Sequence, residues 1–108
     1  MLPESGNLYD PPVAAPQEHE AFQTLFESGA TRVERIVSHR HASPPGFWYD
    51  QPGSEWVAVL QGEATLEFAG ERMVEMRGGD WVSIPAHVRH RVARTAPATI
   101  WLAVHAAP

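Results

Sequence analysis

Histidine offers the widest range of chemistry in this chain, because a neutral imidazole can bind a metal ion and can also exchange protons near neutral pH. The chain has six histidines. His39 and His41 are separated by one residue, and in a strand two such side chains project from the same face. The pair therefore predicts either a chelate for one metal ion or two ordinary surface histidines. His19 and His105 are expected at the surface.

Two further residues could complete a site with this pair. Glu55 opens the apolar segment 56–60, where a charged residue is expected only at a rim or bound to a partner. His90 lies between two arginines in a predicted strand. If both arginines face solvent, alternation directs His90 inward together with Arg94. An inward histidine is either a ligand or a hydrogen-bonded core residue.

Short strands must position these residues, because ten prolines and eight glycines divide the chain into short segments. From Thr31 onward, apolar and β-branched runs bounded by glycine or proline predict seven strands. They cover residues 31–41, 56–60, 64–68, 72–77, 81–84, 89–94 and 99–105. Apolar residues at helical spacing predict one short helix over Glu18–Ser28, and the proline-rich residues 1–16 are expected to form an arm. Many short strands predict an all-β sandwich or barrel.

Length and composition limit the class of protein. A chain of 108 residues has the size of one domain. Its net charge of −5 argues against nucleic acid as the main partner, because the phosphate backbone needs a basic face. The absence of cysteine excludes disulfides and thiolate metal sites. No apolar run is long enough to span a membrane and the first residues lack a signal-peptide pattern, so a cytoplasmic protein without a membrane partner is expected.

The segment from Gly79 onward resembles the second sequence motif of the cupin superfamily, G-x5-P-x-G-x2-H-x3-N. Gly79, Pro85 and His90 stand at the offsets that this motif requires. His87 takes the place of the second glycine, and Arg94 takes the place of the asparagine. The resemblance covers residues 31–105 and is to small single-domain bacterial cupins.

The first cupin motif, G-x5-H-x-H-x3–4-E-x6-G, is matched in its parts. Glu55 is followed by six residues and then Gly62, and His39 and His41 supply the His-x-His. An insert of thirteen residues, 42–54, precedes Glu55, where the family has three or four. The resemblance implies one divalent metal ion (Fe, Mn, Ni or Zn) held by four side chains, those of His39, His41, Glu55 and His90.

The same resemblance implies a fold and a function. The fold is a jelly-roll β-barrel over 31–108, preceded by an arm and the short helix over 1–30. The function is metal binding, either in a metal-dependent oxygenase acting on a small organic molecule or in a non-catalytic module, such as a sensor or carrier, that binds a metal or a small ligand. Small jelly rolls leave unpaired edge strands, so a homodimer is also expected.

The insert 42–54 holds most of the remaining candidates. Its aromatic tip between prolines is expected either to form the lip of a pocket, or to plug the barrel end or cover a dimer contact. Asp50 or Gln51 could replace Glu55 as the fourth metal ligand. Arg94 is expected to face inward, paired with a substrate carboxylate or with Glu55 or Asp50. The predicted pocket-lining residues are Phe47, Trp48, Tyr49, Asp50, Gln51, His87 and Arg94.

Overall fold

The computed structural model of the chain describes residues 2–10 and 19–108, and within these ranges it contains strands but no helix. The strands are β1 (Ala21–Ser28), β2 (Thr31–Ser38), β3 (Ser54–Gln61), β4 (Glu63–Phe68), β5 (Arg72–Arg77), β6 (Trp81–Ile84), β7 (His90–Thr95) and β8 (Thr99–Ala106). The described residues therefore include no helix of the length and apolar character that crossing a membrane requires.

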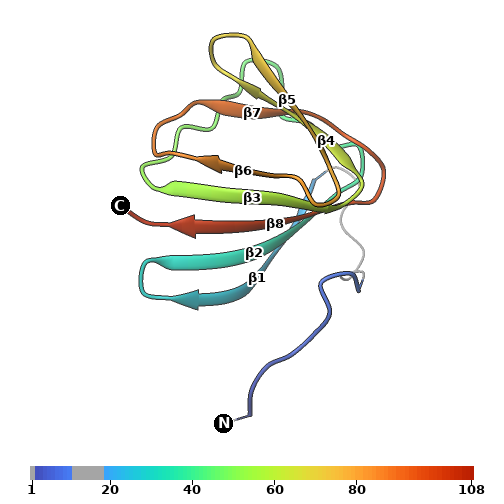
Figure 1. Cartoon of the computed structure of the whole chain (residues 1–108), viewed down its shortest axis with the longest axis vertical. Coiled ribbons are helices and arrows are strands. Elements are labelled where there is room, and N and C mark those ends of the chain that lie inside the picture. The colour runs from blue at the N-terminus through green and yellow to red at the C-terminus, as the bar shows by residue number, and fades with distance from the viewer. Residues whose placement is uncertain (1, 11–18) are drawn as a thin grey trace.

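The strands form two antiparallel sheets around a common core. One sheet has five strands in the order β1-β2-β8-β3-β6, and the other has three in the order β5-β4-β7. Figure 1 shows the five strands rising from β1 to β6, with the smaller sheet above them. Strands distant in sequence become neighbours, β2 beside β8 and β4 beside β7, because the chain crosses between the sheets. This confirms the expectation of an all-β jelly roll.

The apolar core lies between the two sheets, and a turn at a glycine joins β3 of one sheet to β4 of the other. The buried apolar cluster consists of Val57, Val59, Ala64, Leu66, Met76, Ile84, Trp101 and Ala103. Gly62 connects β3 to β4 with a φ of 88°, in the left-handed region that favours glycine. A Cβ atom there would lie 2.6 Å from Thr99 Oγ1 and 2.8 Å from Thr99 Cα. The turn therefore has no room for a side chain.

All seven strands predicted from Thr31 onward are present, with the first ending at Ser38. The predicted helix over Glu18–Ser28 is wrong, because Ala21–Ser28 forms the edge strand β1; Glu18 itself lies outside the described residues. The register of β1 against β2 shifts between Thr24 and Phe26. The apolar residues of β1 therefore do not keep a two-residue period, and pairing with β2 overrides the weak local preference for a helix.

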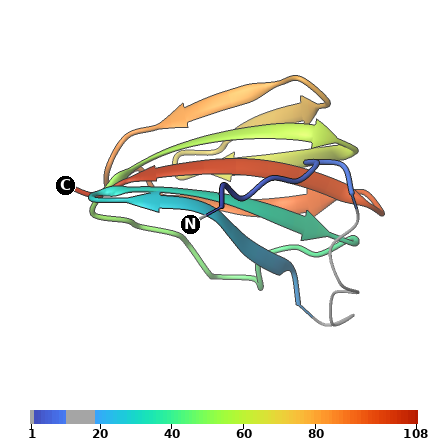
Figure 2. The same cartoon turned by 90° about the horizontal axis from the view of Figure 1, so that it is seen from below.

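The segment 39–53, which joins β2 to β3, runs back along the barrel (Figure 2). β2 ends at Ser38, opposite Thr99, whereas β3 begins at Ser54, opposite Ala106. Thr99 and Ala106 are the two ends of β8, about 23 Å apart at the usual rise of a strand. The connecting segment must therefore span the length of the sheet, and backbone hydrogen bonds to β7 hold it there.

The N-terminal residues 2–10 are tied to the outer face of β2. Arg35 is buried and its Nη1 donates hydrogen bonds to the backbone oxygens of Asn7, Leu8 and Asp10 at 3.1, 3.1 and 2.9 Å. A guanidinium group suits this task because it presents several donors in a fixed plane. The rest of the predicted arm, residue 1 and residues 11–16, lies outside the described residues.

Candidate functional site

A cavity of about 280 Å³ opens between the two sheets. Its walls are mostly apolar and come from both sheets, and polar and charged side chains also line it. The lining residues are Glu20, Phe22, Arg32, Glu34, Ile36, Tyr49, Gln51, Glu55, Val57, Leu66, Ile84, His90, Val92, Trp101 and His105. An apolar cavity with a few convergent polar groups is the usual form of a small-molecule site.

Three neighbouring strands of the large sheet bring Glu34, Glu55 and His105 together. Glu55 on β3 lies directly opposite His105 on β8. His105 points inward because it alternates with Ala103 and Trp101, both of which are buried in the core. Glu34 on β2 lies opposite Ala103, next to the position of His105, so its carboxylate reaches the same side of the cavity.

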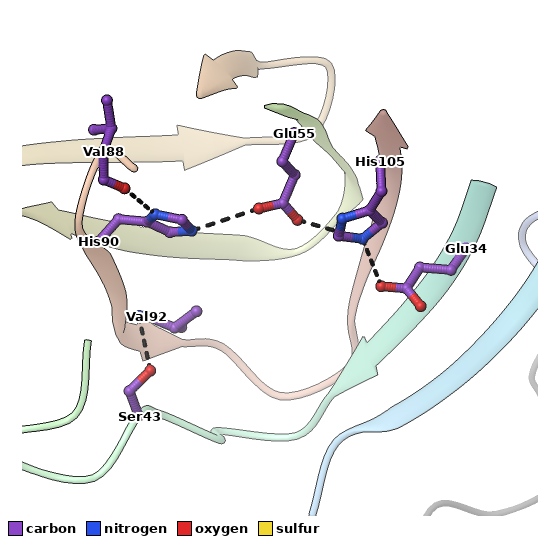
Figure 3. A network of polar contacts seen from close by, with 7 residues as sticks. All are labelled: Glu34, Ser43, Glu55, Val88, His90, Val92 and His105. Carbon is purple, nitrogen blue, oxygen red and sulfur yellow. Dashed lines mark hydrogen bonds and ion pairs between the residues drawn. The ribbon is translucent and has the colours of Figure 1, made fainter. Parts of the chain in front are cut away.

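Together with His90 on β7 of the smaller sheet, these three side chains form a row that joins the two sheets, as Figure 3 shows. Nε2 of His90 lies 3.5 Å from Glu55 Oε1, and Nε2 of His105 lies 3.7 Å from Glu55 Oε2. His105 Nε2 also lies 2.9 Å from Glu34 Oε1, at hydrogen-bond distance. At the other end of the row, Nδ1 of His90 lies 2.9 Å from the backbone oxygen of Val88. The order is therefore Val88 carbonyl, His90, Glu55, His105 and Glu34.

This row constrains where a proton sits. A carbonyl oxygen only accepts, so Nδ1 of His90 carries hydrogen and donates to Val88. Its Nε2 faces a carboxylate, an arrangement that is favourable when a proton lies on Nε2 or on Glu55. Burial, the largest single contribution, lowers the pKa of His90, but the hydrogen bond and charge of Glu55 and the Val88 carbonyl together outweigh it. The pKa of His90 is therefore raised above its ordinary value.

Tyr49 and Gln51 extend from the insert into the same cavity. The ring of Tyr49 stacks on the imidazole of His90, with centroids 5.4 Å apart and planes at 24°. Two backbone hydrogen bonds join these residues, Tyr49 N to His90 O at 2.7 Å and His90 N to Tyr49 O at 3.1 Å. Burial, followed by the charges of Glu20, Glu55 and Glu34, raises the pKa of the Tyr49 phenol, so it remains a hydrogen-bond donor at neutral pH.

The structure brings His90 and Glu55 together but does not bring His39 and His41 to them. His39 follows the Ser38 end of β2, whereas Glu55 lies opposite His105 near the other end of the sheet. About seven residues of strand, or roughly 23 Å, separate the two levels. His41 Nδ1 accepts a hydrogen bond of 2.9 Å from the backbone N–H of His39, so one of its two metal-binding nitrogens is engaged. Neither histidine lines the cavity.

The metal ion that the resemblance implies therefore does not fit its predicted ligands. In residues 2–10 and 19–108, no group of three or more histidine, aspartate and glutamate side chains is arranged to hold a metal ion. Of the predicted alternatives to Glu55, Gln51 lines the cavity, whereas Asp50 is exposed and pairs with His87 at 2.8 Å.

Among the other predicted pocket residues, only Tyr49 and Gln51 contribute to the cavity wall. Phe47 is exposed and packs edge-on against Tyr49 at 4.8 Å, and Trp48 carries the guanidinium of Arg89 over its ring at 5.5 Å. His87 is exposed with Asp50 at the adjoining turn. From the insert, therefore, the alternating residues Tyr49 and Gln51 line the cavity.

Arg94 does not face inward as predicted. Its side chain is 54% exposed and lies 3.5 Å from Glu63. The pairing of β4 with β7 shifts between Thr65 and Leu66, which oppose Arg94 and Val92, so one extra residue of β7 interrupts the alternation. A bulge of this kind turns the following side chain to the other face. The alternation from His90 therefore holds at Val92 but fails at Arg94.

The sequence interpretation missed Glu34, Glu20 and His105. The expectation that His105 lies at the surface is wrong, since its side chain is 17% exposed and contacts two carboxylates. Its alternation with Trp101 and Ala103 was the available signal. The charge of Glu34 within the β-branched segment 31–38 was a second signal, because a charged residue in such a segment needs a partner. His19 is exposed, as predicted.

Comparison with known proteins agrees with this fold. The cupin domain family model matches residues 32–105. A protein of known structure from Ralstonia eutropha JMP134, which carries the provisional name mannose-6-phosphate isomerase, is 51% identical; the alignment covers 98% of this chain and 100% of that chain, with a TM-score of 0.89. No curated protein matches the chain.

More distant structures share the fold alone. An RmlC-like cupin from Desulfovibrio desulfuricans is 19% identical, with 95% of each chain covered and a TM-score of 0.77. A cupin superfamily protein from Desulfitobacterium hafniense DCB-2 is 16% identical, with 89% of this chain and 84% of that chain covered and a TM-score of 0.75. The family model spans well over half of the chain, and the jelly-roll topology agrees with it: the chain belongs to the cupin family.

Proposed function

We propose that this cupin binds a small organic molecule in the barrel cavity and transfers a proton to or from it. The observation that carries the proposal is the row of four residues that line the cavity, His90, Glu55, His105 and Glu34. Imidazoles and carboxylates are the side chains most often used as general acids and bases. Here they lie in mutual contact and next to space for a ligand.

His90 and Glu55 are the proposed acid–base pair. Because Nδ1 of His90 donates to Val88, Nε2 is the nitrogen left to exchange a proton. A proton shared between Nε2 and Glu55 makes one group an acid and leaves the other available as a base. The pair can then remove a proton from one atom of the ligand and return it to a neighbouring atom.

His105 and Glu34 support this pair. The 2.9 Å hydrogen bond to Glu34 orients the imidazole of His105 beside Glu55. Glu55 lies between the two imidazoles, with His90 Nε2 3.5 Å from one of its oxygens and His105 Nε2 3.7 Å from the other, so both rings contribute to the electrostatic surroundings of Glu55.

The charge of the cavity bears on the class of ligand. The provisional name of the Ralstonia eutropha protein suggests a sugar phosphate, and interconversion of an aldose and a ketose is a proton transfer of the proposed kind. However, the three carboxylates of Glu20, Glu34 and Glu55 outnumber two possible cations, Arg32, which is 46% exposed and 3.8 Å from Glu34, and His90 when it is protonated. Such a cavity opposes a phosphate dianion. The proposed ligand is therefore a neutral or cationic molecule with a carbonyl or hydroxyl group.

The family resemblance implied a metal-dependent oxygenase or a non-catalytic binding module. Two of the four predicted metal ligands, His39 and His41, lie outside the cavity, so no step of the proposed mechanism runs through a metal ion. The non-catalytic module shares the cavity with our proposal and differs from it only in turnover.

Proton exchange with solvent tests the proposal. The protein is incubated in heavy water with a panel of neutral sugars, hydroxyketones and amino ketones, with mannose 6-phosphate as the anionic comparison. Nuclear magnetic resonance follows deuterium entering the C–H position beside the carbonyl. We expect exchange into at least one neutral or cationic compound and none into the phosphate. Glu55→Gln keeps the size of the side chain but not the base, and should slow exchange by about 100-fold or more.

Glu63→Gln is the matched control, because Glu63 is an exposed carboxylate paired with Arg94 outside the cavity. It should leave exchange unchanged. Binding in the cavity without exchange would favour the non-catalytic module. No binding by any member of the panel, or full exchange in Glu55→Gln, would contradict the proposal.

A further inference from the structure

The spacing of the first cupin motif, counted back from Glu55, gives the positions of its two imidazoles in this chain. The motif places three or four residues between the second histidine and the glutamate. With a spacing of three, the second histidine position is Gln51 and the first is Tyr49. With a spacing of four, they are Asp50 and Trp48. Neither pair contains a histidine.

The structure distinguishes between these two registers. Tyr49 and Gln51 line the cavity beside His90 and Glu55. Trp48 and Asp50 face other partners, the guanidinium of Arg89 and the exposed ring of His87. Backbone hydrogen bonds hold this segment in place. His87 N donates to Gln51 O at 2.8 Å, and Tyr49 bonds to His90 through both its N–H and its C=O group. Tyr49 and Gln51 therefore occupy the places that the motif gives to its imidazoles.

The presence of tyrosine and glutamine in place of two histidines changes what the cavity can bind. Imidazole is a strong ligand for iron, nickel and zinc, whereas a neutral phenol and a carboxamide are much weaker ones. Both replacements can instead exchange hydrogen bonds with an organic molecule, the phenol through its O–H and the amide through its N–H and C=O groups. The aromatic ring of Tyr49 also covers one face of His90, at a centroid distance of 5.4 Å.

We infer that the cavity of this cupin works without a bound metal ion, because Tyr49 and Gln51 stand where the motif has its two metal-binding imidazoles and offer hydrogen bonds to the ligand in their place. The inference concerns the same cavity as the proposed function. It does not depend on that function, because metal content is measured without any organic ligand.

The test is to restore the imidazoles. Tyr49→His/Gln51→His adds two imidazoles beside His90 and Glu55, and cobalt(II) is the probe because its visible absorption reports the ligands around it. We expect the double variant to bind about one cobalt ion per chain and the unaltered protein below about a tenth of an ion. Elemental analysis after loading with zinc, iron, manganese or nickel should give the same contrast. Adding Glu55→Gln to the double variant should weaken cobalt binding by about tenfold or more, as loss of a ligand requires.

Two results would overturn the inference. One is about one divalent ion per chain in the unaltered protein, lost in Glu55→Gln. The other is a folded double variant, shown by a cooperative thermal transition, that does not bind cobalt. If the double variant does not fold, Gln51→His alone provides a three-ligand set with His90 and Glu55. It should bind cobalt at least about tenfold more tightly than the unaltered protein does, and equal affinities would overturn the inference.

Discussion

The contact between His90 and Glu55 links protonation to stability. Their side chains are 6% and 12% exposed, so the charge on each depends strongly on the other. Burial disfavours the imidazolium, yet Glu55 and the Val88 carbonyl together raise the pKa of His90. A group whose pKa is higher in the folded than in the unfolded state stabilises the fold below its unfolded pKa. That stabilisation is lost as the pH rises through the folded pKa.

Glu55→Gln should therefore cost stability in a pH-dependent way. We expect a loss of about 2 kcal/mol in the free energy of unfolding at pH 6, where His90 is charged and bonded to a carboxylate. At pH 9, above the ordinary histidine pKa, less of His90 carries a charge, and the loss should be smaller. Urea unfolding at both pH values measures the difference. Glu67→Gln, which breaks the ion pair with Arg91, is the control and should cost the same at both. An equal cost of Glu55→Gln at the two pH values would refute the linkage.

At the scale of elements, the β3–β4 turn determines whether the two sheets can enclose the cavity. Gly62→Ala should destabilise the fold by about 3 kcal/mol, because it adds left-handed strain and also forces a Cβ atom against Thr99. Gly70→Ala is the matched control, since Gly70 has a φ of 98° but open space around its Cα. Gly70→Ala should lose about 1 kcal/mol of stability, from the left-handed backbone strain alone. Thermal unfolding compares the two variants, and equal costs would show that the close approach to Thr99 is unimportant.

The strands from Thr31 onward could be predicted because glycine or proline marks their ends and alternation marks their faces. The same alternation correctly directed His90 inward, and it was sufficient to direct His105 inward beside Trp101 and Ala103. It failed where the backbone is irregular. A bulge in β7 turns Arg94 outward, and a register shift in the edge strand β1 produced apolar spacing typical of a helix.

The placement of His39 and His41 could not be read from alternation at all. Two histidines on one strand face look like a chelate, but which end of the barrel they occupy depends on how β2 pairs with β8 and β8 with β3. That register is set by contacts between strands distant in sequence. The insert 42–54 adds a second difficulty. It contains the motif positions 49 and 51, and these hold tyrosine and glutamine in place of histidine, so a search for histidines does not find them.

At the scale of the whole molecule, the edge strands decide how chains associate. β1 and β6 are the two edge strands of the five-stranded sheet. β1 is eight residues long, whereas β6 is four residues long. β1 also exposes two large aromatic side chains, with Phe22 58% and Phe26 57% exposed. A long edge strand with exposed aromatic residues favours pairing with another copy, because pairing satisfies its free backbone groups and covers apolar area at once.

We therefore expect a homodimer that depends on β1. Light scattering at micromolar concentration should give twice the chain mass of 11.9 kDa. Phe26→Glu places a charge on the exposed face of β1 and should shift the protein to the monomer, because a buried unpaired carboxylate opposes association. Phe26 does not line the cavity, so the folded monomer should still bind the cavity's ligand. Met73→Glu is the matched control on β5 of the smaller sheet, with a side chain exposed to a similar extent, and should remain dimeric. A monomeric unaltered protein would refute the dimer, and a Phe26→Glu protein that stays dimeric would place the interface elsewhere than β1.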